Sequence, residues 1–327
     1  MKIKSILISV FVFMALLSSV SCAAAGNSER IDNTAASLLH EKIYLYDEGN
    51  VPYGDDCREF CFMTPYLAAY PTGGAVLVFP GGGYNHLSNS TSDVKGYGQG
   101  VDNNGNQKES SSIAAWYNER GISVFVVNYR TTAVEPNADY RHILSDAARA
   151  MRIVRGNAEK YYLSKDKIVV QGYSAGGHLA AMLLTQDEWV PDDENYVPDE
   201  YDKISAKPNA GVLCYAALSF QDELANKSTR KIFSGGDKAL YDRFSAEKCV
   251  TANTPPCFLW CHEKDGTVNS GNTYAMAEAL DKAGVYNECH VYDDNGTTAH
   301  GLGVAQEYEE ARAWPDEATA FLKNMSF

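Results

Sequence analysis

A strand-like run passes directly into a helical pattern through a Gly-x-Ser-x-Gly sequence near the middle of this 327-residue chain. The segment reads KIVVQGYSAGGH over residues 167–178. Small residues two positions on either side of Ser174 allow a sharp strand-to-helix turn, with the serine exposed at its apex. Because glycine and serine each make up about 7% of average sequences, the bare pattern arises by chance roughly once in ten chains of this length. Its context must therefore decide what it means.

Apolar β-rich runs alternate with amphipathic patterns along most of the chain, which is the arrangement of successive βαβ units. The predicted strands are 74–79, 122–129, 167–171, 211–216, 257–261 and 288–292. The predicted helices are 111–119, 143–161, 176–186, 273–283 and 311–324. We therefore predict an α/β fold with a mainly parallel central sheet and helices on both faces. No internal repeat or composition break marks a second domain, so residues 26–327 are expected to form one domain.

The first 25 residues are typical of an export signal. Two lysines precede the apolar run Ile6–Val20, and the small residues of Ser21–Ala25 suit cleavage by signal peptidase. Cys22 also matches the lipidated cysteine of bacterial lipoproteins, although Ser19 stands where that signal usually has leucine. We expect an extracytoplasmic protein, either secreted, periplasmic or held at the bacterial cell surface by an N-terminal lipid anchor.

Charge and cysteine spacing exclude several classes of partner. The net charge of −14 argues against binding to nucleic acid or to an anionic membrane surface. No cysteine–histidine spacing fits a zinc site, so no metal or cofactor is expected. Cys57 with Cys61, or Cys249 with Cys289, could form a disulfide in an exported protein, but spacing does not decide the pairing.

Two polar stretches read as insertions between the predicted elements. The stretch 87–108 is rich in glycine, asparagine and serine, and the stretch 187–208 is acidic and contains three prolines. Both are expected to be surface loops.

A nucleophilic serine needs a base that takes its proton and an acid that orients the base. In the arrangement around a Gly-x-Ser-x-Gly turn these follow the serine in the order acid, then histidine. Asp265 lies in the turn after a predicted strand, and His300 lies in a glycine-flanked loop after the last one. Asp265 could be an ordinary Asp-Gly turn residue, and Glu263 and Asp293 are rival acids. The shared order predicts Ser174 as nucleophile, His300 as base and Asp265 as acid.

A glycine-rich sequence, PGGGY at 80–84, follows the first predicted strand of the core. Backbone N–H groups at such a junction can stabilise the oxyanion of acyl transfer. The sequence is not a phosphate-binding loop, because no Lys-Ser/Thr pair follows and the spacing is not G-x-G-x-x-G. The N–H groups of Gly82, Gly83 and Ala175 are predicted to face the substrate's carbonyl oxygen.

These motifs together resemble the α/β-hydrolase superfamily and, within it, the bacterial acetyl-esterase and carbohydrate-esterase branch. The resemblance covers residues 70–325 and is carried by 80–84, 128–130, 172–178, 265–268 and 299–301. Glu109 before the segment 111–121 also matches an acidic residue and short helix of that branch. The resemblance implies an exported serine esterase that removes acetyl or other short acyl groups from plant polysaccharide, such as xylan, or from oligosaccharide. Pro80 stands where many lipase-type relatives carry histidine, which points away from the lipases.

Two aromatic residues beside the predicted site, Tyr84 and Tyr173, are expected to contact the sugar, with core packing as the alternative. The sequence leaves other functions open. The chain could be a peptidase or lipase on the same scaffold, or a carbohydrate-binding relative without catalysis. The three candidate residues of the triad favour an enzyme, and the polar insertions disfavour the apolar lid of a lipase.

Overall fold

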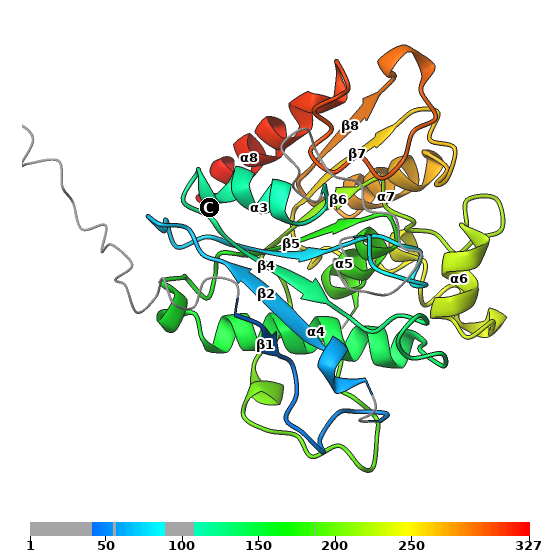
Figure 1. The fold of residues 1–327 in the computed structure, drawn as a ribbon. Coiled ribbons are helices and arrows are strands. Elements are labelled where there is room, and N and C mark those ends of the chain that lie inside the picture. Colours follow the sequence, from blue (N-terminus) through cyan, green and yellow to red (C-terminus); the bar gives the residue numbers. More distant parts are fainter. Residues whose placement is uncertain (1–40, 55–56, 89–107, 187) are drawn as a thin grey trace, which may run out of the picture.

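Eight strands form one sheet in the computed structural model, which describes residues 41–54, 57–88, 108–186 and 188–327 (Figure 1). The strand order is β1-β2-β4-β3-β5-β6-β7-β8. The strands are β1 (Ile43–Tyr44), β2 (Phe62–Tyr66), β3 (Ala75–Phe79), β4 (Ser123–Asn128), β5 (Ile168–Tyr173), β6 (Ala210–Cys214), β7 (Cys257–His262) and β8 (Asn287–Tyr292). β1 and β2 are antiparallel to their neighbours, and β4, β3 and β5 to β8 are parallel. The predicted α/β fold with a mainly parallel sheet is confirmed.

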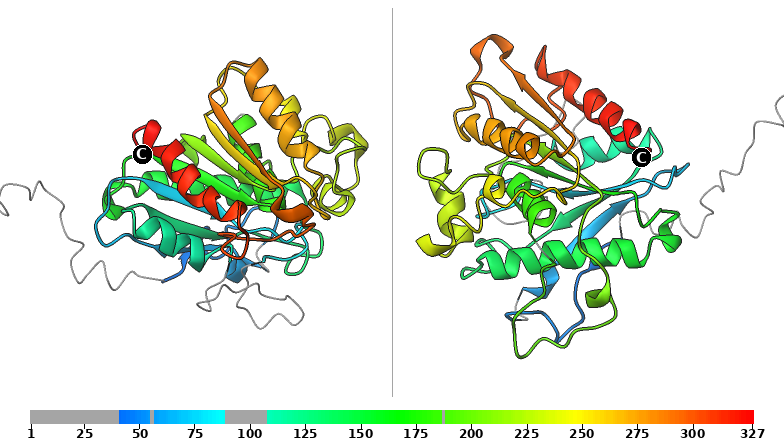
Figure 2. Two further views of the ribbon diagram at one scale, coloured as in Figure 1. Left: turned by 90° about the horizontal axis from the view of Figure 1, so that it is seen from above. Right: turned by 180° about the vertical axis from the view of Figure 1, so that it is seen from behind.

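Helices cover both faces of this sheet. The α-helices are α3 (Ser111–Asn118), α4 (Tyr140–Gly156), α5 (Ala175–Thr185), α6 (Lys227–Phe233), α7 (Gly271–Lys282) and α8 (Trp314–Asn324). The short 3-10 helices are η1 (Arg58–Phe60), η2 (Glu159–Tyr161), η3 (Tyr201–Lys203), η4 (Lys238–Leu240), η5 (Ala246–Lys248), η6 (Asp294–Gly296) and η7 (Ala311–Ala313). Figure 1 looks onto the layer of α3 and α8, and the right view of Figure 2 looks onto α4, α5 and α7.

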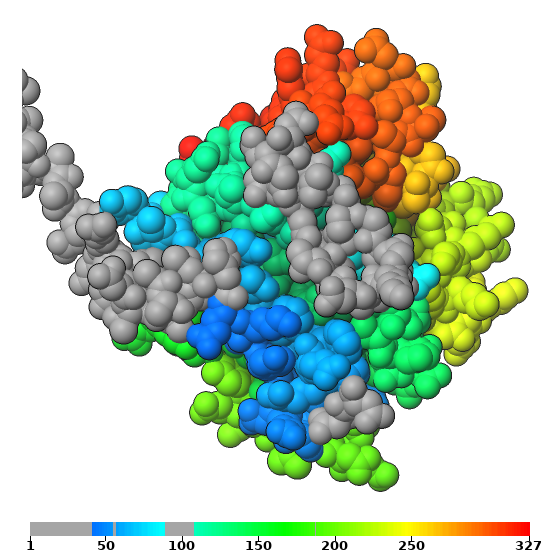
Figure 3. Space-filling view, in the orientation of Figure 1, coloured from blue at the N-terminus to red at the C-terminus, as the bar shows by residue number. Residues whose placement is uncertain are grey.

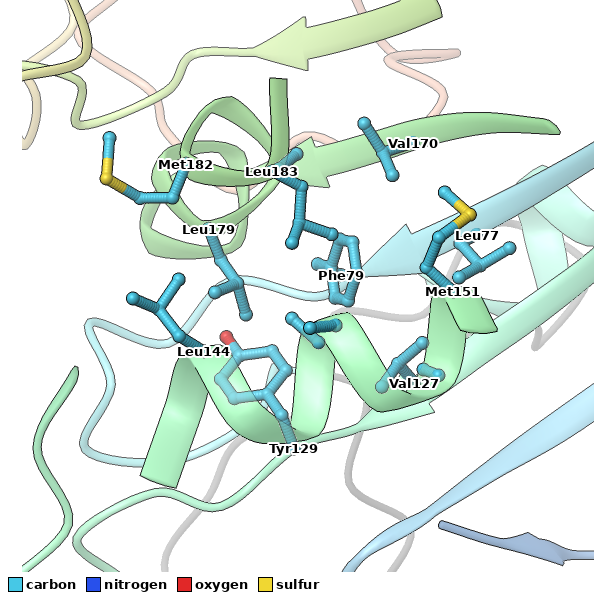
Figure 4. Close-up of a cluster of buried hydrophobic side chains, with 14 of the residues drawn as sticks. Leu77, Phe79, Val127, Tyr129, Leu144, Met151, Val170, Leu179, Met182 and Leu183 are labelled. Atoms are coloured by element: carbon cyan, nitrogen blue, oxygen red, sulfur yellow. The ribbon is translucent and has the colours of Figure 1, made fainter. Parts of the chain in front are cut away.

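The core has two layers because successive side chains of a strand point to opposite faces. Leu77 and Phe79 of β3 pack against α4 and α5, in the cluster that Figure 4 shows. Val76 and Val78 of the same strand pack with residues of α3 and α8 on the other face. Since both faces are covered, β3 and β5 are buried along their whole length, as is typical of the central strands of a parallel sheet.

The first two strands and α6 are absent from the sequence-based assignment. Pro65 lies inside β2, and proline lacks the N–H that a central strand needs. The structure accommodates it because β1 pairs only with Phe62 and Met63, so among the described strands none pairs with Pro65 on that side. α6 has only seven residues, which is too short for a helical period to be evident.

The acidic insertion is a surface segment, as expected, and three arginines of α4 hold it. Arg149 pairs with Asp199 and Asp202, while Arg152 pairs with Glu188. Arg155 donates to the carbonyls of residues 205 and 207. The arginines on the outer face of α4 therefore attach this segment to the domain.

The outer strands of the sheet are β1 and β8. In Figure 3 the blue N-terminal residues of the described part lie low in the view, and the orange and red C-terminal residues lie at the top. The predicted signal, including Cys22, and residues 89–107 of the first insertion lie outside the described residues. Among the described helices, none combines the length and the apolar character that crossing a membrane requires.

Candidate active site

Ser174 occupies a strained turn between β5 and α5. Its backbone has φ 53° and ψ −118°, a region that residues with a side chain rarely adopt. Such strain is characteristic of a nucleophile held at the apex of a strand-to-helix turn. The glycines at either end make the turn possible: a Cβ on Gly172 would lie 2.1 Å from the carbonyl oxygen of Gly176. A Cβ on Gly176 would lie 2.1 Å from the carbonyl oxygen of Phe79.

The structure brings together the three residues that the sequence order singles out. His300 Nε2 lies 2.8 Å from Ser174 Oγ, and His300 Nδ1 lies 2.6 Å from Asp265 Oδ2. Because a carboxylate only accepts hydrogen bonds, Nδ1 carries the proton and Nε2 is left to accept the serine hydroxyl. The carboxyl group of Asp265 is 1% exposed, and the imidazole of His300 is 15% exposed. The base therefore faces solvent, while its acid partner is shielded.

Backbone hydrogen bonds hold the acid and the histidine loop together. Asp265 Oδ1 accepts the N–H groups of Thr267 and Val268 at 2.8 and 2.9 Å, which fixes the turn after β7. The next residue, Gly266, donates its N–H to the carbonyl of Thr298, two residues before His300. The Asp265 turn and the histidine loop are thus joined directly, which sets the distance from carboxylate to imidazole.

The glycine-rich sequence forms a loop beside Ser174. Gly82 and Gly83 have φ values of 119° and 65°, which favour glycine, and a Cβ on Gly81 would lie 3.2 Å from Ser174 Cβ. Ala175 is the first residue of α5, where backbone N–H groups point away from the helix. In the described part of the chain, the N–H groups of Gly82, Gly83 and Ala175 donate to no other group. These three N–H groups can therefore donate to an oxyanion.

Neither tyrosine that was expected to contact the sugar reaches the surface. Tyr84 is fully buried, its hydroxyl lies 2.8 Å from His178 Nδ1, and its ring stacks on Phe233. Tyr173 is also fully buried, because β5 directs its side chain into the core under α3 and α8. The expectation that these side chains contact the substrate is therefore wrong, and core packing accounts for both.

The rival acids lie elsewhere. Glu263 Oε2 accepts a hydrogen bond from the hydroxyl of Tyr274, and Asp293 Oδ1 lies 3.9 Å from Lys264 Nζ. Asp294, next along the chain, forms a second histidine–aspartate pair, with its Oδ2 2.9 Å from His262 Nε2. This pair has no serine partner among the described residues, so it does not compete with the array at Ser174.

Tyr215 is a residue of the site that the sequence does not reveal. It follows β6, and its ring packs edge-on against His300 with ring centroids 4.8 Å apart. Its backbone has φ 38°, which is unusual for a tyrosine. The sequence shows only an aromatic residue at the end of an apolar strand, and nothing there signals contact with a histidine 85 positions later.

A polar cleft of about 440 Å³ opens beside Asp265. It lies between residues 223–226, after β6, and residues 263–270, around the Asp265 turn. The side chain of Asn226 donates to the carbonyl of Thr267 and so joins the two walls. No group of three or more His, Cys, Asp or Glu side chains within the described ranges is placed to hold a metal ion.

The strand order, the strained serine turn and the Ser174–His300–Asp265 array define an α/β-hydrolase fold. The BD-FAE family model matches residues 94–280, more than half of the chain, and this range includes Ser174 and Asp265. The chain therefore belongs to the BD-FAE family.

Two curated relatives are similar over most of this chain. Endo-1,4-beta-xylanase B of Butyrivibrio fibrisolvens is 31% identical over 234 residues, which is 71% of this chain and 33% of that protein. The acetylxylan esterase of Xylanibacter ruminicola is 27% identical over 255 residues, 76% of this chain and 45% of that protein. The chain thus spans only a third to somewhat under half of these relatives.

Solved structures match the domain more completely. An acetyl ester-xyloside bifunctional hydrolase from Caldicellulosiruptor lactoaceticus superposes with a TM-score of 0.73 at 31% identity, over 88% of this chain and 97% of that chain. A thermophilic esterase from Thermogutta terrifontis superposes with a TM-score of 0.66 at 24% identity, over 88% and 93%, and shares the fold.

Proposed function

We propose that this protein is a serine esterase that hydrolyses acetyl or other short acyl esters through an acyl-enzyme intermediate. The proposal rests on the continuous contact from Ser174 Oγ to His300 Nε2, at 2.8 Å, and from His300 Nδ1 to Asp265 Oδ2, at 2.6 Å. A serine within hydrogen-bond reach of a base that a carboxylate orients is what nucleophilic acyl transfer requires. The strained backbone at Ser174 is consistent with the same role.

In this mechanism Ser174 Oγ attacks the ester carbonyl carbon while His300 Nε2 takes the hydroxyl proton. The tetrahedral intermediate collapses as the protonated His300 gives that proton to the leaving alcohol oxygen, and the acyl group stays on Ser174. Water then attacks the acyl-enzyme while His300 takes its proton, the bond between the acyl carbon and Ser174 Oγ breaks as His300 returns that proton to Oγ, and the carboxylic acid leaves. Asp265 holds the imidazole in the required tautomer and stabilises its cation.

The oxyanion of each tetrahedral intermediate would be held by the backbone N–H groups of Gly82, Gly83 and Ala175. Their location beside Ser174 and at the start of α5 supports this assignment, because both the N–H groups and the helix dipole favour negative charge there. Loss of one such donor typically costs a factor of about 10² to 10³ in kcat.

The substrate we propose is an acetylated plant polysaccharide or oligosaccharide, with a sugar hydroxyl as the leaving group. The polar cleft beside Asp265 supports a carbohydrate, because its walls carry Glu223, Asn226 and Asn269, which can bind sugar hydroxyls. One relative is named an acetylxylan esterase and another an acetyl ester-xyloside bifunctional hydrolase, which agrees with this class. The xylanase is matched over a third of its length, so its name lends no glycosidase activity to this chain.

The test is hydrolysis of p-nitrophenyl acetate and release of acetate from acetylated xylan by the wild type and by Ser174→Ala. We expect both activities in the wild type and neither in the variant. Ser145→Ala, which removes a serine hydroxyl from α4 outside the site, is the control and should stay active. If Ser174→Ala retains the wild-type rate, the mechanism is wrong. Cleavage of peptides or long-chain triglycerides instead of acetyl esters would favour a peptidase or lipase, and binding without hydrolysis would favour a non-catalytic relative.

We also propose that the protein is exported, on the strength of the lysines and apolar run that begin the sequence. Cell fractionation and mass spectrometry of the mature N-terminus test this. Cleavage near residue 25 indicates secretion, a diacylglyceryl group on Cys22 indicates a lipid anchor, and an intact leader in the cytoplasm contradicts export.

A further inference from the structure

Glu109 is a carboxylate buried beneath the candidate site. It precedes α3, is 4% exposed, and accepts hydrogen bonds from a backbone N–H and two hydroxyl groups. Within the described residues no lysine or arginine forms an ion pair with it. Burying a carboxylate without a cation is costly, so the position calls for a reason beyond packing.

One oxygen of Glu109 holds the glycine-rich loop. Oε2 accepts the N–H of Gly81 at 2.8 Å and also the hydroxyl of Ser88. The other side of the same peptide group is held as well, because the Tyr129 hydroxyl donates to the carbonyl of Pro80 at 2.6 Å. Because both the C=O of Pro80 and the N–H of Gly81 are hydrogen-bonded, the peptide group between these residues has a fixed orientation. This orientation in turn limits the directions in which the N–H groups of Gly82 and Gly83 can point.

The other oxygen of Glu109 holds the histidine side of the site. Oε1 accepts the hydroxyl of Tyr215 at 2.8 Å, and that hydroxyl in turn accepts the N–H of Gly303 at 3.1 Å. Gly303 belongs to the loop of His300, and the ring of Tyr215 packs against the imidazole. One carboxylate thus connects the oxyanion loop to the residue that supports the base.

We propose that Glu109 and Tyr215 are positioning residues that keep the oxyanion loop and the His300 loop aligned on Ser174, an inference that rests on the esterase function proposed above. Glutamate suits this role because a carboxylate only accepts hydrogen bonds, and all three of its partners donate. Glutamine has the same shape but directs an NH₂ group at one of these donors. The strained backbone of Tyr215, at φ 38°, is a further cost that the role explains.

The experiment measures kcat, KM and melting temperature for Glu109→Gln, Tyr215→Phe and the double variant with p-nitrophenyl acetate. We expect each single variant to lower kcat about 10- to 100-fold, the size of effect that a displacement of about 1 Å produces, while KM stays within a few-fold. The double variant should be no worse than the poorer single variant, because both act through one connection.

Two matched controls separate positioning from general destabilisation. Glu188→Gln alters a glutamate that also accepts a backbone N–H and a serine hydroxyl, but in the acidic insertion. Tyr117→Phe removes a buried tyrosine hydroxyl that donates to Gln171 at 2.7 Å. Both controls should lower stability without lowering kcat.

The proposal is overturned if Glu109→Gln and Tyr215→Phe both keep the wild-type kcat. It is also overturned if the fold-loss of kcat in the double variant equals the product of the two single losses. If Glu109→Gln fails to fold, Tyr215→Phe decides alone: a lower kcat with unchanged KM supports positioning, and an unchanged kcat rejects it. A wild type inactive on every ester overturns the esterase function itself, whereas an active wild type with fully active variants overturns only the positioning role.

Discussion

Replacing Gly176 with alanine tests how tightly the serine turn packs against the glycine-rich loop. The added Cβ would lie 2.1 Å from the carbonyl oxygen of Phe79 and 2.4 Å from that of Pro80. Carbon and oxygen atoms rarely approach closer than about 3.3 Å, so the turn and the loop must separate by about 1 Å. Both oxygens belong to the backbone and cannot rotate away as a side chain could.

Two opposing effects decide the stability of Gly176→Ala. Alanine in a helix is more favourable than glycine by up to about 1 kcal/mol, and Gly176 lies in the first turn of α5. Overpacking costs roughly 1 to 3 kcal/mol, so the clash prevails and the free energy of unfolding falls by about 1 to 2 kcal/mol. The effect on catalysis is larger, because a displacement of about 1 Å between nucleophile and oxyanion site lowers kcat about 100-fold.

The assay combines urea unfolding with the kcat for p-nitrophenyl acetate. Gly74→Ala is the matched control, since a Cβ there would meet Ile122 at 3.6 Å, an ordinary contact just before the same strand β3. It should stay within about 0.5 kcal/mol of the wild type and keep its kcat. A Gly176→Ala protein with wild-type kcat would refute the claim that the spacing of turn and loop governs the reaction.

Three further predictions concern other parts of the molecule. Arg130→Met leaves the fully buried carboxylate of Asp146 without its ion-pair partner. The free energy of unfolding, measured by urea titration, should fall by about 3 to 5 kcal/mol, and a loss under about 1 kcal/mol would refute the prediction. Burial lowers the pKa of His178 from 6.5 to about 4, so as the pH falls the unfolded chain binds a proton at this residue before the folded protein does. The stability that the neutral, buried imidazole contributes is therefore complete above pH 6.5 and is lost as the pH falls toward 4. Stability in His178→Gln should therefore fall less steeply over that range, and an unchanged slope in urea titrations would contradict it. Glu223 lies on the exposed wall of the polar cleft, and Glu223→Ala should lower kcat/KM for acetylated xylo-oligosaccharide about 3- to 10-fold. The kcat/KM for p-nitrophenyl acetate should not change, and an equal loss with both substrates would argue against a sugar site in this cleft.

The sequence was sufficient to predict the six strands β3 to β8 and the relative order of the key residues. Long buried strands such as β3 and β5 are continuous apolar runs, which are legible without tertiary information. Ser174, Asp265 and His300 could be found because each lies in the turn or loop that follows a predicted strand, and parallel strands bring their carboxyl ends to one edge of the sheet.

What the sequence did not reveal depends on side-chain direction and on contacts between distant segments. Tyr173 was misjudged because adjacency to Ser174 suggests exposure, whereas the alternation along β5 turns the side chain into the core. Tyr84 has a left-handed backbone, φ 63°, and its ring packs inward on Phe233. The burial of Glu109 and its connection to Tyr215 follow from tertiary packing, and no local pattern in the chain encodes them.

In the proposed mechanism Ser174 becomes covalently acylated during turnover. A fluorophosphonate reacts with an activated serine in the same way, so mass spectrometry of the labelled and digested protein tests this acylation directly. Labelling should be stoichiometric, confined to the peptide that contains Ser174, and strongly slowed in His300→Ala. Stoichiometric labelling of another serine, or an unlabelled Ser174 in a protein that hydrolyses acetyl esters, would contradict this mechanism.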